Sequence, residues 1–169
     1  PYINQWNYTI GAILKRRITN GYYNLSLSRN MFDNALDRWE DGNDFDENYR
    51  ALKVRSQEIE NKMRLEVNKY QGKWKYAYGG MLQYVKYNNA TFSKINNGVY
   101  DSAGNQLAPP LFIDFNSDIA FFKGGLFAEV SSRFLNDRLG LTFGLRTDVN
   151  TFTTDGLKPW ETLSPRLSA

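Results

Sequence analysis

The densest group of side chains that could bind a metal ion or a ligand is an acidic segment between Asn30 and Arg50. Seven carboxylates stand there against two arginines, a local balance of −5 (2 − 7). The acidic residues of the segment are Asp33, Asp37, Glu40, Asp41, Asp44, Asp46 and Glu47. Asp44, Asp46 and Asn48 have the alternate spacing that begins a calcium-binding loop, but Tyr49 stands where such a loop needs Gly. Its twelfth position, which requires Glu, holds Arg55. We therefore expect a solvated acidic loop and no metal site.

An aromatic side chain lies inside this acidic segment. Trp39 is flanked by Asp37-Arg38 and Glu40-Asp41, a setting in which the indole could stack on a sugar or a chelate. The same indole could equally pack the loop against its neighbours. The candidate ligand-binding residues are Trp39, Asp41, Asp44 and Asp46.

Catalytic groups are scarce in this chain. It contains no Cys and no His, which removes thiol nucleophiles, disulfides, ordinary zinc sites and every Ser–His or Cys–His pair. Glu58 and Glu60 could suggest glycosidase chemistry. They are, however, same-face neighbours on an open charged strand, without a pocket or an obvious cause of a pKa shift. We expect no enzymatic activity and no cofactor.

Composition narrows the class of protein further. A chain of 169 residues with 41% hydrophobic and 23% charged residues predicts one folded domain with a real core. The net charge is +3 and the pI about 9.1, but the basic residues are scattered, so we do not expect nucleic-acid binding. No apolar run approaches the roughly 20 residues of a membrane helix. The start at Pro1, without a signal-peptide pattern, predicts a processed product or a piece of a longer chain.

Period-two alternation of apolar and polar residues dominates the sequence and predicts strands. Three hairpins are expected, at residues 6–30, 57–87 and 119–149, and a further strand begins at 163–169. The segment 47–70 is also rich in helix formers, but alternation accounts for Leu65 and a helix does not. The predicted fold is all-β: an antiparallel up-and-down meander of about six to seven strands.

The connections between the strands alternate in length. Tight turns are expected near residues 19–21, 71–73 and 135–138, the first two with Asn-Gly and Gln-Gly sequences. The linkers 31–54, 88–117 and 150–162 are long, which is typical of outer-membrane barrels. Aromatic residues gather at strand ends, as in interfacial girdles. A soluble sheet with its apolar face packed inward fits the same alternation, so both architectures stay open at this point.

Three short sequences in the last third of the chain follow one another in an order that is found in a known protein family. They are Gly124–Glu129 (GGLFAE), Leu141–Asp148 (LTFGLRTD) and Leu163–Leu167 (LSPRL). They resemble the barrel of TonB-dependent outer-membrane receptors of the kind abundant in Bacteroidetes, in which a Gly-Leu-Arg-Tyr-Asp strand end precedes a loop and a Ser-Pro-Arg strand start. Thr147 departs from that pattern, since Tyr is commoner there. The segment 72–80 also resembles the barrel sequences of these receptors.

The resemblance implies a segment of a receptor and transporter in the outer membrane of a Gram-negative bacterium. Such receptors are barrels of about 22 strands with a plugged lumen. The implied partners are outer-membrane lipid, a plug domain of the same parent chain, the TonB complex and an unknown small-molecule ligand, such as a metal chelate, a vitamin or a glycan. The lumen-facing residues would be Glu58, Glu60, Lys62, Arg64, Glu66, Arg146 and Asp148. The rival interpretations are a soluble antiparallel β module that binds a ligand or glycan, and a small outer-membrane barrel enzyme.

Overall fold

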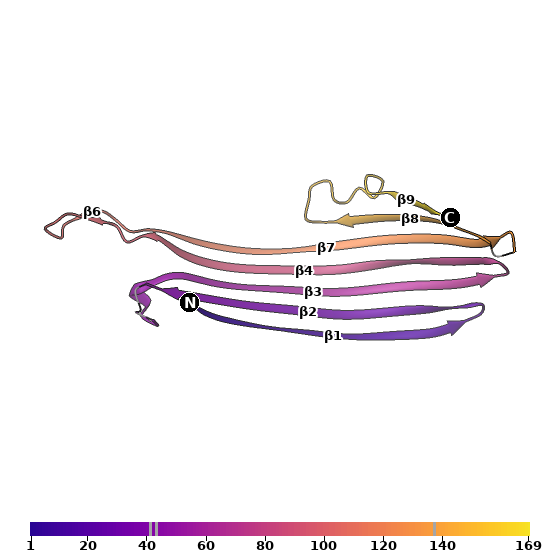
Figure 1. The fold of residues 1–169 in the computed structure, drawn as a ribbon, viewed down its shortest axis with the longest axis horizontal. Helices are drawn as coiled ribbons and strands as arrows, with labels where there is room; N and C mark the ends of the chain where they lie inside the picture. Colours follow the sequence, from indigo (N-terminus) through magenta and orange to yellow (C-terminus); the bar gives the residue numbers. More distant parts are fainter. Residues whose placement is uncertain (41, 43, 137) are drawn as a thin grey trace. The chain divides into compact units, whose positions relative to one another are not determined.

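The computed structural model describes residues 1–40, 42, 44–136 and 138–169, and most of them lie in one antiparallel sheet. The sheet order is β1-β2-β3-β4-β7-β8-β9, so each strand pairs with its sequence neighbour in the sheet (Figure 1). The strands are β1 (Tyr2–Ile18), β2 (Gly21–Trp39), β3 (Arg50–Gln71), β4 (Trp74–Asn96), β5 (Val99–Tyr100), β6 (Gln106–Ala108), β7 (Leu111–Phe134), β8 (Leu139–Asn150) and β9 (Ser164–Ser168). A separate two-stranded sheet joins β5 to β6. The predicted all-β meander is confirmed, and the sheet is open between β1 and β9.

The predicted linkers 31–54 and 88–117 were too long. The strand β2 continues to Trp39 and β3 begins at Arg50, while β4 continues to Asn96 and β7 begins at Leu111. Asn and Asp are depleted in strands on average, which made these segments look like loops. Here their side chains have cross-strand partners, as where Gln57 Nε2 donates to Asp33 Oδ2 at 3.2 Å.

The choice between strand and helix for residues 47–70 is resolved in favour of the strand. All of Arg50–Gln71 is extended, and only Glu47–Tyr49 forms a single 3₁₀ turn, η1. The Asp46 side chain caps this turn by accepting a hydrogen bond from the Asn48 backbone N–H at 2.9 Å. This assignment means that the polar and apolar residues of the segment lie on opposite faces of β3.

The tight turns lie where the sequence predicts them. Asn20 and Gly72 adopt positive φ angles of 58° and 57°, the conformation that a two-residue hairpin turn requires. The third turn contains Leu135 and Asn136, also at positive φ, and its predicted member Asp137 lies outside the described residues. Short turns of this kind leave little freedom in the register of each hairpin.

The register between β7, β8 and β9 fixes two faces with different chemistry. Ala128 lies opposite Leu145 and Val130 opposite Phe143, so their apolar side chains share one face. The apolar series continues into β9, where Leu167 pairs with Phe143. On the other face, charged residues lie opposite a phenylalanine or a glycine of the neighbouring strand. These pairs are Phe127 with Arg146, Gly125 with Asp148, and Gly144 with Arg166.

The chain forms two compact units. Unit 1 comprises residues 1–8, 31–59 and 86–119, and unit 2 comprises residues 9–30, 60–85 and 120–169. Unit 2 contains the three tight turns, whereas unit 1 contains η1 and the β5–β6 hairpin. The strands β1, β2, β3, β4 and β7 contribute residues to both units.

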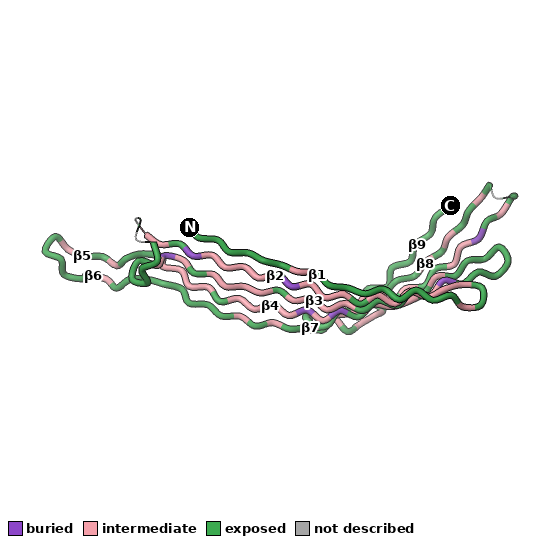
Figure 2. The backbone as a smooth tube through the Cα atoms, turned by 90° about the horizontal axis from the view of Figure 1, so that it is seen from below, coloured by how far each residue is buried: buried purple, intermediate pink, exposed green. Residues whose placement is uncertain are grey.

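The core expected for a chain of this length is missing, so that prediction was wrong. Among the described residues, only Met31, Ala51 and Val85 are buried hydrophobic residues. Most of the backbone is exposed or of intermediate burial (Figure 2). The accessible area is 12,180 Å², whereas a compact monomer of 19.6 kDa exposes about 8,600 Å². The physical reason is that a single sheet layer has no second layer to cover its apolar side chains.

Candidate functional site

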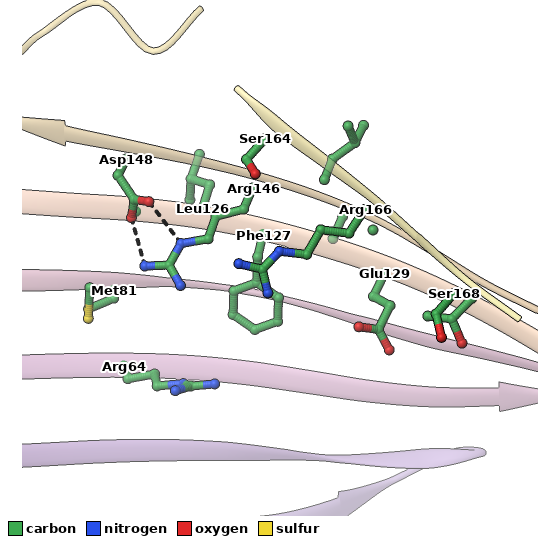
Figure 3. Close-up of a pocket in the computed structure, with 15 residues that line it drawn as sticks. Arg64, Met81, Leu126, Phe127, Glu129, Arg146, Asp148, Ser164, Arg166 and Ser168 are labelled. Atoms are coloured by element: carbon green, nitrogen blue, oxygen red, sulfur yellow. Dashed lines mark hydrogen bonds and ion pairs between the residues drawn. The ribbon is translucent and has the colours of Figure 1, made fainter. Parts of the chain in front are cut away.

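The polar face of unit 2 holds a cavity of about 400 Å³ that spans β3, β4, β7, β8 and β9 (Figure 3). It is built at positions where alternate residues of adjacent strands point to the same side. The charged and aromatic side chains that line it are Arg64, Phe127, Glu129, Arg146, Asp148 and Arg166. Ser164 and Ser168 add hydroxyl groups at the β9 side.

Arg146 is the most firmly oriented cation of this cavity. Its Nε and Nη2 donate to the two carboxylate oxygens of Asp148 at 2.8 and 2.9 Å. Both residues lie on β8, two positions apart, so they share a face. Gly125 lies opposite Asp148 in the register, and a Cβ on Gly125 would lie only 2.5 Å from Asp148 Oδ1. The missing side chain therefore leaves the space in which the carboxylate sits.

Phe127 supplies an aromatic surface beside these charges. The guanidinium carbon of Arg64 lies 5.6 Å from the centre of the Phe127 ring, within the range of a cation–π interaction. Arg64 also donates to Glu66 at 3.0 Å. Figure 3 shows the Arg166 side chain extending from β9 toward Phe127 and Arg146. Three guanidinium groups and one phenyl ring thus gather on one face.

This arrangement suits binding of a polar ligand better than bond-making chemistry. Guanidinium forks bind planar anionic groups, and an aromatic ring packs against a flat apolar surface of a ligand. The lining residues include no nucleophile held against a general base. In the described part of the chain, no group of three or more acidic side chains is arranged to hold a metal ion.

The predicted lumen-facing residues are distributed between this cavity and neighbouring pairs on β3. The cavity brings together Arg64, Arg146 and Asp148. Glu60 accepts a hydrogen bond from Gln83 at 2.7 Å and lies 4.0 Å from Lys62. The remaining two residues of the prediction are Glu66, which accepts from Asn68 at 2.9 Å, and Glu58, which is exposed in unit 1.

Among the charged and aromatic side chains of the cavity, sequence reasoning missed three: Phe127, Glu129 and Arg166. The alternation of β7 already placed Phe127 and Glu129 on the polar face, where an aromatic residue is an informative exception. Arg166 lies on the short strand β9, and only the register with Gly144 brings it to this site.

The predicted ligand-binding residues of unit 1 do not form one open site. The Trp39 ring lies 5.0 Å from the ring of Phe45 and 5.3 Å from the Arg50 guanidinium, so it packs the connection between β2 and β3. Asp46 caps η1, and Asp44 is exposed at the surface. Asp41 lies outside the described residues.

Asp37 is the centre of the ion pairs in this region, although it was not predicted as a site residue. Its side chain is only 6% exposed and lies 2.6 Å from both Arg50 and Arg55. Arg50 also pairs with Glu47 of η1. Lys94 on β4 pairs with Glu40 at 3.5 Å, which ties the same connection to another strand. These contacts give Asp37, Glu40 and Glu47 ionic partners, whereas Asp44 and Asp46 of the connection are exposed to solvent, as the sequence predicted for the loop.

Comparison with known proteins adds no relative. No protein-family description, curated protein or solved structure matches the chain. No helix among the described residues is long and apolar enough to cross a membrane.

Proposed function

We propose that the chain is part of the wall of a TonB-dependent receptor and transporter in the outer membrane of a Gram-negative bacterium. Its strands would face lipid on one side and a plugged lumen on the other, and its long connections would help to capture a small-molecule ligand. The chain itself would carry no catalytic activity. A plug domain and a TonB-contacting segment, elsewhere in the parent protein, would open the path for uptake.

The observation that carries this proposal is the exposed apolar face of unit 2. This face comprises Ile10, Ala12, Leu14, Leu25, Leu27, Met63, Leu65, Val67, Leu82, Leu126, Ala128, Val130, Leu141, Phe143 and Leu145. Ile10 and Leu126 are each 65% exposed. Soluble monomers rarely expose an apolar patch of more than a few hundred Å². Lipid is a solvent in which such a face is stable.

Aromatic pairs bound this apolar face at both ends. At the tight-turn end, the rings of Trp74 and Phe134 lie 6.0 Å apart, and Lys73 lies 4.6 Å from the Phe134 ring. At the other end, the rings of Tyr84 and Phe122 lie 5.0 Å apart. Amphipathic aromatic residues concentrate at membrane interfaces, and lysine stems extend there toward water.

The spacing of the two aromatic pairs fits a bilayer. Trp74 and Tyr84 lie ten positions apart on β4 (84 − 74). At a rise of about 3.3 Å per residue, that distance is about 33 Å along the strand. A strand tilted by about 40° then spans about 25 Å, the height of the apolar band of outer-membrane barrels. The match supports a membrane crossing within unit 2.

The polar face of unit 2 fits a lumen. It carries the cavity with Arg64, Arg146 and Arg166, together with the Gln83–Glu60 hydrogen bond. Charged walls are stable in a barrel only where they face water or protein. A plug domain or a passing ligand would meet these groups from inside.

Surface labelling of the intact parent protein tests the proposal. An epitope is inserted at Gly104, an exposed residue of unit 1 at which an added Cβ would meet no atom within 4 Å. A matched control epitope is inserted at Lys73 in a tight turn of unit 2. We expect antibodies to label intact cells at the first site, and to label the second site only after the outer membrane is opened.

Two results would contradict the proposal. Recovery of the parent protein in the soluble fraction without detergent would favour a soluble β module. Equal labelling of both epitopes on intact cells would show that the strands do not cross the membrane between these two sites.

A further inference from the structure

Two charged side chains of the cavity in unit 2 have no ionic partner among the described residues. Arg146 is paired with Asp148 at 2.8 Å, and Arg64 is paired at 3.0 Å with a glutamate of its own strand. The other two charged lining residues are Glu129 on β7 and Arg166 on β9. Figure 3 draws both of them without a hydrogen bond or an ion pair to another residue of the cavity. The cavity therefore offers one unpaired anion and one unpaired cation to a ligand.

A glycine keeps the space between these two side chains open. Gly144 of β8 lies opposite Glu129 on one side and opposite Arg166 on the other. Facing positions of paired strands point to the same side of a sheet, so the three residues share the polar face. A Cβ added at Gly144 would meet Glu129 Cγ at 3.9 Å and no atom of Arg166 within 4 Å. A ligand can therefore lie over Gly144 and reach both charges.

The two unpaired charges decide which class of ligand fits the cavity. A dianion would meet only one unpaired cation and would be repelled by Glu129. A neutral ligand would exclude water from both charges without pairing either of them, which costs free energy. A ligand with one carboxylate and one ammonium group pairs both, because a guanidinium fork binds a carboxylate and a carboxylate accepts from an ammonium group. The charge balance thus favours a zwitterion.

The separation of the two charges favours a short peptide over a free amino acid. The strands β7 and β9 flank β8, and neighbouring strands lie about 4.8 Å apart, so the backbones of Glu129 and Arg166 are about 10 Å apart. Both charged groups of an amino acid are attached to one carbon atom. An extended di- or tripeptide spans up to about 7–11 Å. The cavity volume of about 400 Å³ also lies in the range of small-molecule sites.

Other lining groups suit the middle of such a peptide. Thr142 and Ser168 face each other in the register, and hydroxyl groups can both donate to and accept from peptide groups. Phe127 lies two positions from Glu129 on the same face of β7, so an apolar side chain of the peptide can pack against its ring.

We propose that the cavity binds a di- or tripeptide with free termini, with its carboxylate on Arg166 and its ammonium group on Glu129. The inference deepens the proposed function and rests on it, because it names these peptides as the small molecules that are taken up through the lumen. The guanidinium donates hydrogen bonds to the peptide carboxylate, and the peptide ammonium group donates to the Glu129 carboxylate. Recognition by both ends depends on peptide length and terminal charge more than on peptide sequence.

Equilibrium dialysis of the intact parent protein in a neutral detergent tests the inference. The probes are three pools of random di- and tripeptides: one with free termini, one with acetylated amino termini and one with amidated carboxyl termini. Mass spectrometry measures the peptide that the protein retains. We expect retention of the pool with free termini. Each blocked pool should bind about tenfold more weakly, because it lacks one charge-assisted contact.

Charge variants assign the two ends of the peptide. Glu129→Gln should weaken binding of the free pool about tenfold and remove its advantage over the acetylated pool. Arg166→Gln should have the same effect relative to the amidated pool. The matched controls are Asp114→Asn and Arg133→Gln, which change exposed charged residues of β7 that do not line the cavity. They should leave binding unchanged.

Filling the space over Gly144 tests the site without changing a charge. Gly144→Val places a side chain between the two charges and should weaken binding of the free pool. Gly140→Val is the matched control, because Gly140 lies on the same face of β8, does not line the cavity, and has no atom within 4 Å of an added Cβ. It should leave binding unchanged.

Each contrary result has a definite meaning. A parent protein that inserts into bilayers but retains no peptide, or retains the three pools equally, would overturn this inference alone. Equal binding by the Glu129→Gln and Asp114→Asn variants would overturn the assigned site. A parent protein that is soluble without detergent and retains the free pool would overturn the proposed function, and with it the uptake of these peptides, but not their binding.

Discussion

The two units use the same strands but carry opposite chemistry at corresponding alternate positions. In unit 2 these positions form the apolar face, with Leu27 and Met63 among its residues. Continued along β2 and β3 into unit 1, the same alternate positions carry Asp37 and Arg55, which pair at 2.6 Å. The backbone ladder is thus compatible with either environment, and the side chains specify which environment each unit requires.

The pairs of unit 1 extend this contrast to the other strands. Lys86 on β4 lies 3.4 Å from Asp118 on β7, and Gln57 donates to Asp33. Ion pairs and hydrogen bonds of this kind add little to stability in water, and placing their polar groups in lipid costs free energy. We therefore interpret unit 1 as the part of the strands that lies in water and unit 2 as the part that lies in lipid.

The largest expected effect comes from arginine substitutions that test this contrast between unit 1 and unit 2. Leu141→Arg or Leu25→Arg places a charge on the apolar face and should cost about 2–4 kcal/mol in unfolding free energy. Thr142→Arg and Ser26→Arg, on the opposite face of the same strands, should be far milder. Ala90→Arg in unit 1 should also cost little, because Ala90 is exposed beside polar residues. Refolding of the parent protein into vesicles across a urea series measures the differences.

Equal costs on the two faces of β8 would contradict the assignment of faces. A cost for Ala90→Arg as large as that for Leu141→Arg would instead show that the lipid-facing region extends into unit 1.

Asp37→Asn should destabilise unit 1 selectively. The substitution leaves Arg50 and Arg55 without their shared carboxylate, and charge-assisted hydrogen bonds of this kind contribute about 1.5–3 kcal/mol. Asp33→Asn is the matched control, because the Asp33 carboxylate accepts from the neutral Gln57 amide rather than from a cation. Hydrogen exchange should quicken at residues 36–55 and stay unchanged in unit 2. Uniform quickening in both units would mean that they do not unfold separately.

Alanine substitutions at two glycines test how the cavity of unit 2 holds the Asp148 carboxylate. Gly125→Ala would push the Asp148 carboxylate away from its position beside Arg146 and should destabilise the chain slightly, because water screens an exposed ion pair of this kind. Gly144→Ala meets no atom closer than 3.8 Å and should be neutral or stabilising by up to about 1 kcal/mol. Unfolding titrations of the two variants compare them directly. Equal effects would show that the space above Gly125 is not used by Asp148.

The smallest expected effect is a pH dependence in the β5–β6 hairpin of unit 1. A hydrogen bond from the Asn105 side chain, with further backbone hydrogen bonds from Asn105 and Ala103, holds the pKa of Asp101 below its ordinary range. The ionised carboxylate therefore stabilises the turn above its ordinary pKa, and this contribution is lost as the pH falls through the lowered value.

Nuclear magnetic resonance titration of Asp101 measures this effect. Asn105→Ala should bring the pKa of Asp101 back toward its ordinary range, and the exchange of the Ala103 amide should quicken in acid. An Asp101 pKa that does not change in the Asn105→Ala variant would contradict the assigned cause.

Much of the fold followed from alternation, because a period of two is a local property of the chain. It predicted strand rather than helix at Leu65, while the Asn-Gly and Gln-Gly sequences predicted the turns at Asn20 and Gly72. It also placed Arg64, Arg146 and Asp148 on the polar side. The core was predicted wrongly, because composition counts apolar residues without saying whether a second layer covers them.

The sequence by itself determined where the chain is extended, which residues share a strand face and where the hairpins turn. These properties depend on side-chain alternation and on backbone preferences within a few residues. Only the tertiary structure decided that β2 continues through Asp37, that Trp39 packs against Phe45, and that Arg166 joins the cavity. Each of these depends on a partner supplied by another part of the chain, through strand register or through folding of a connection, and no local pattern specifies that partner.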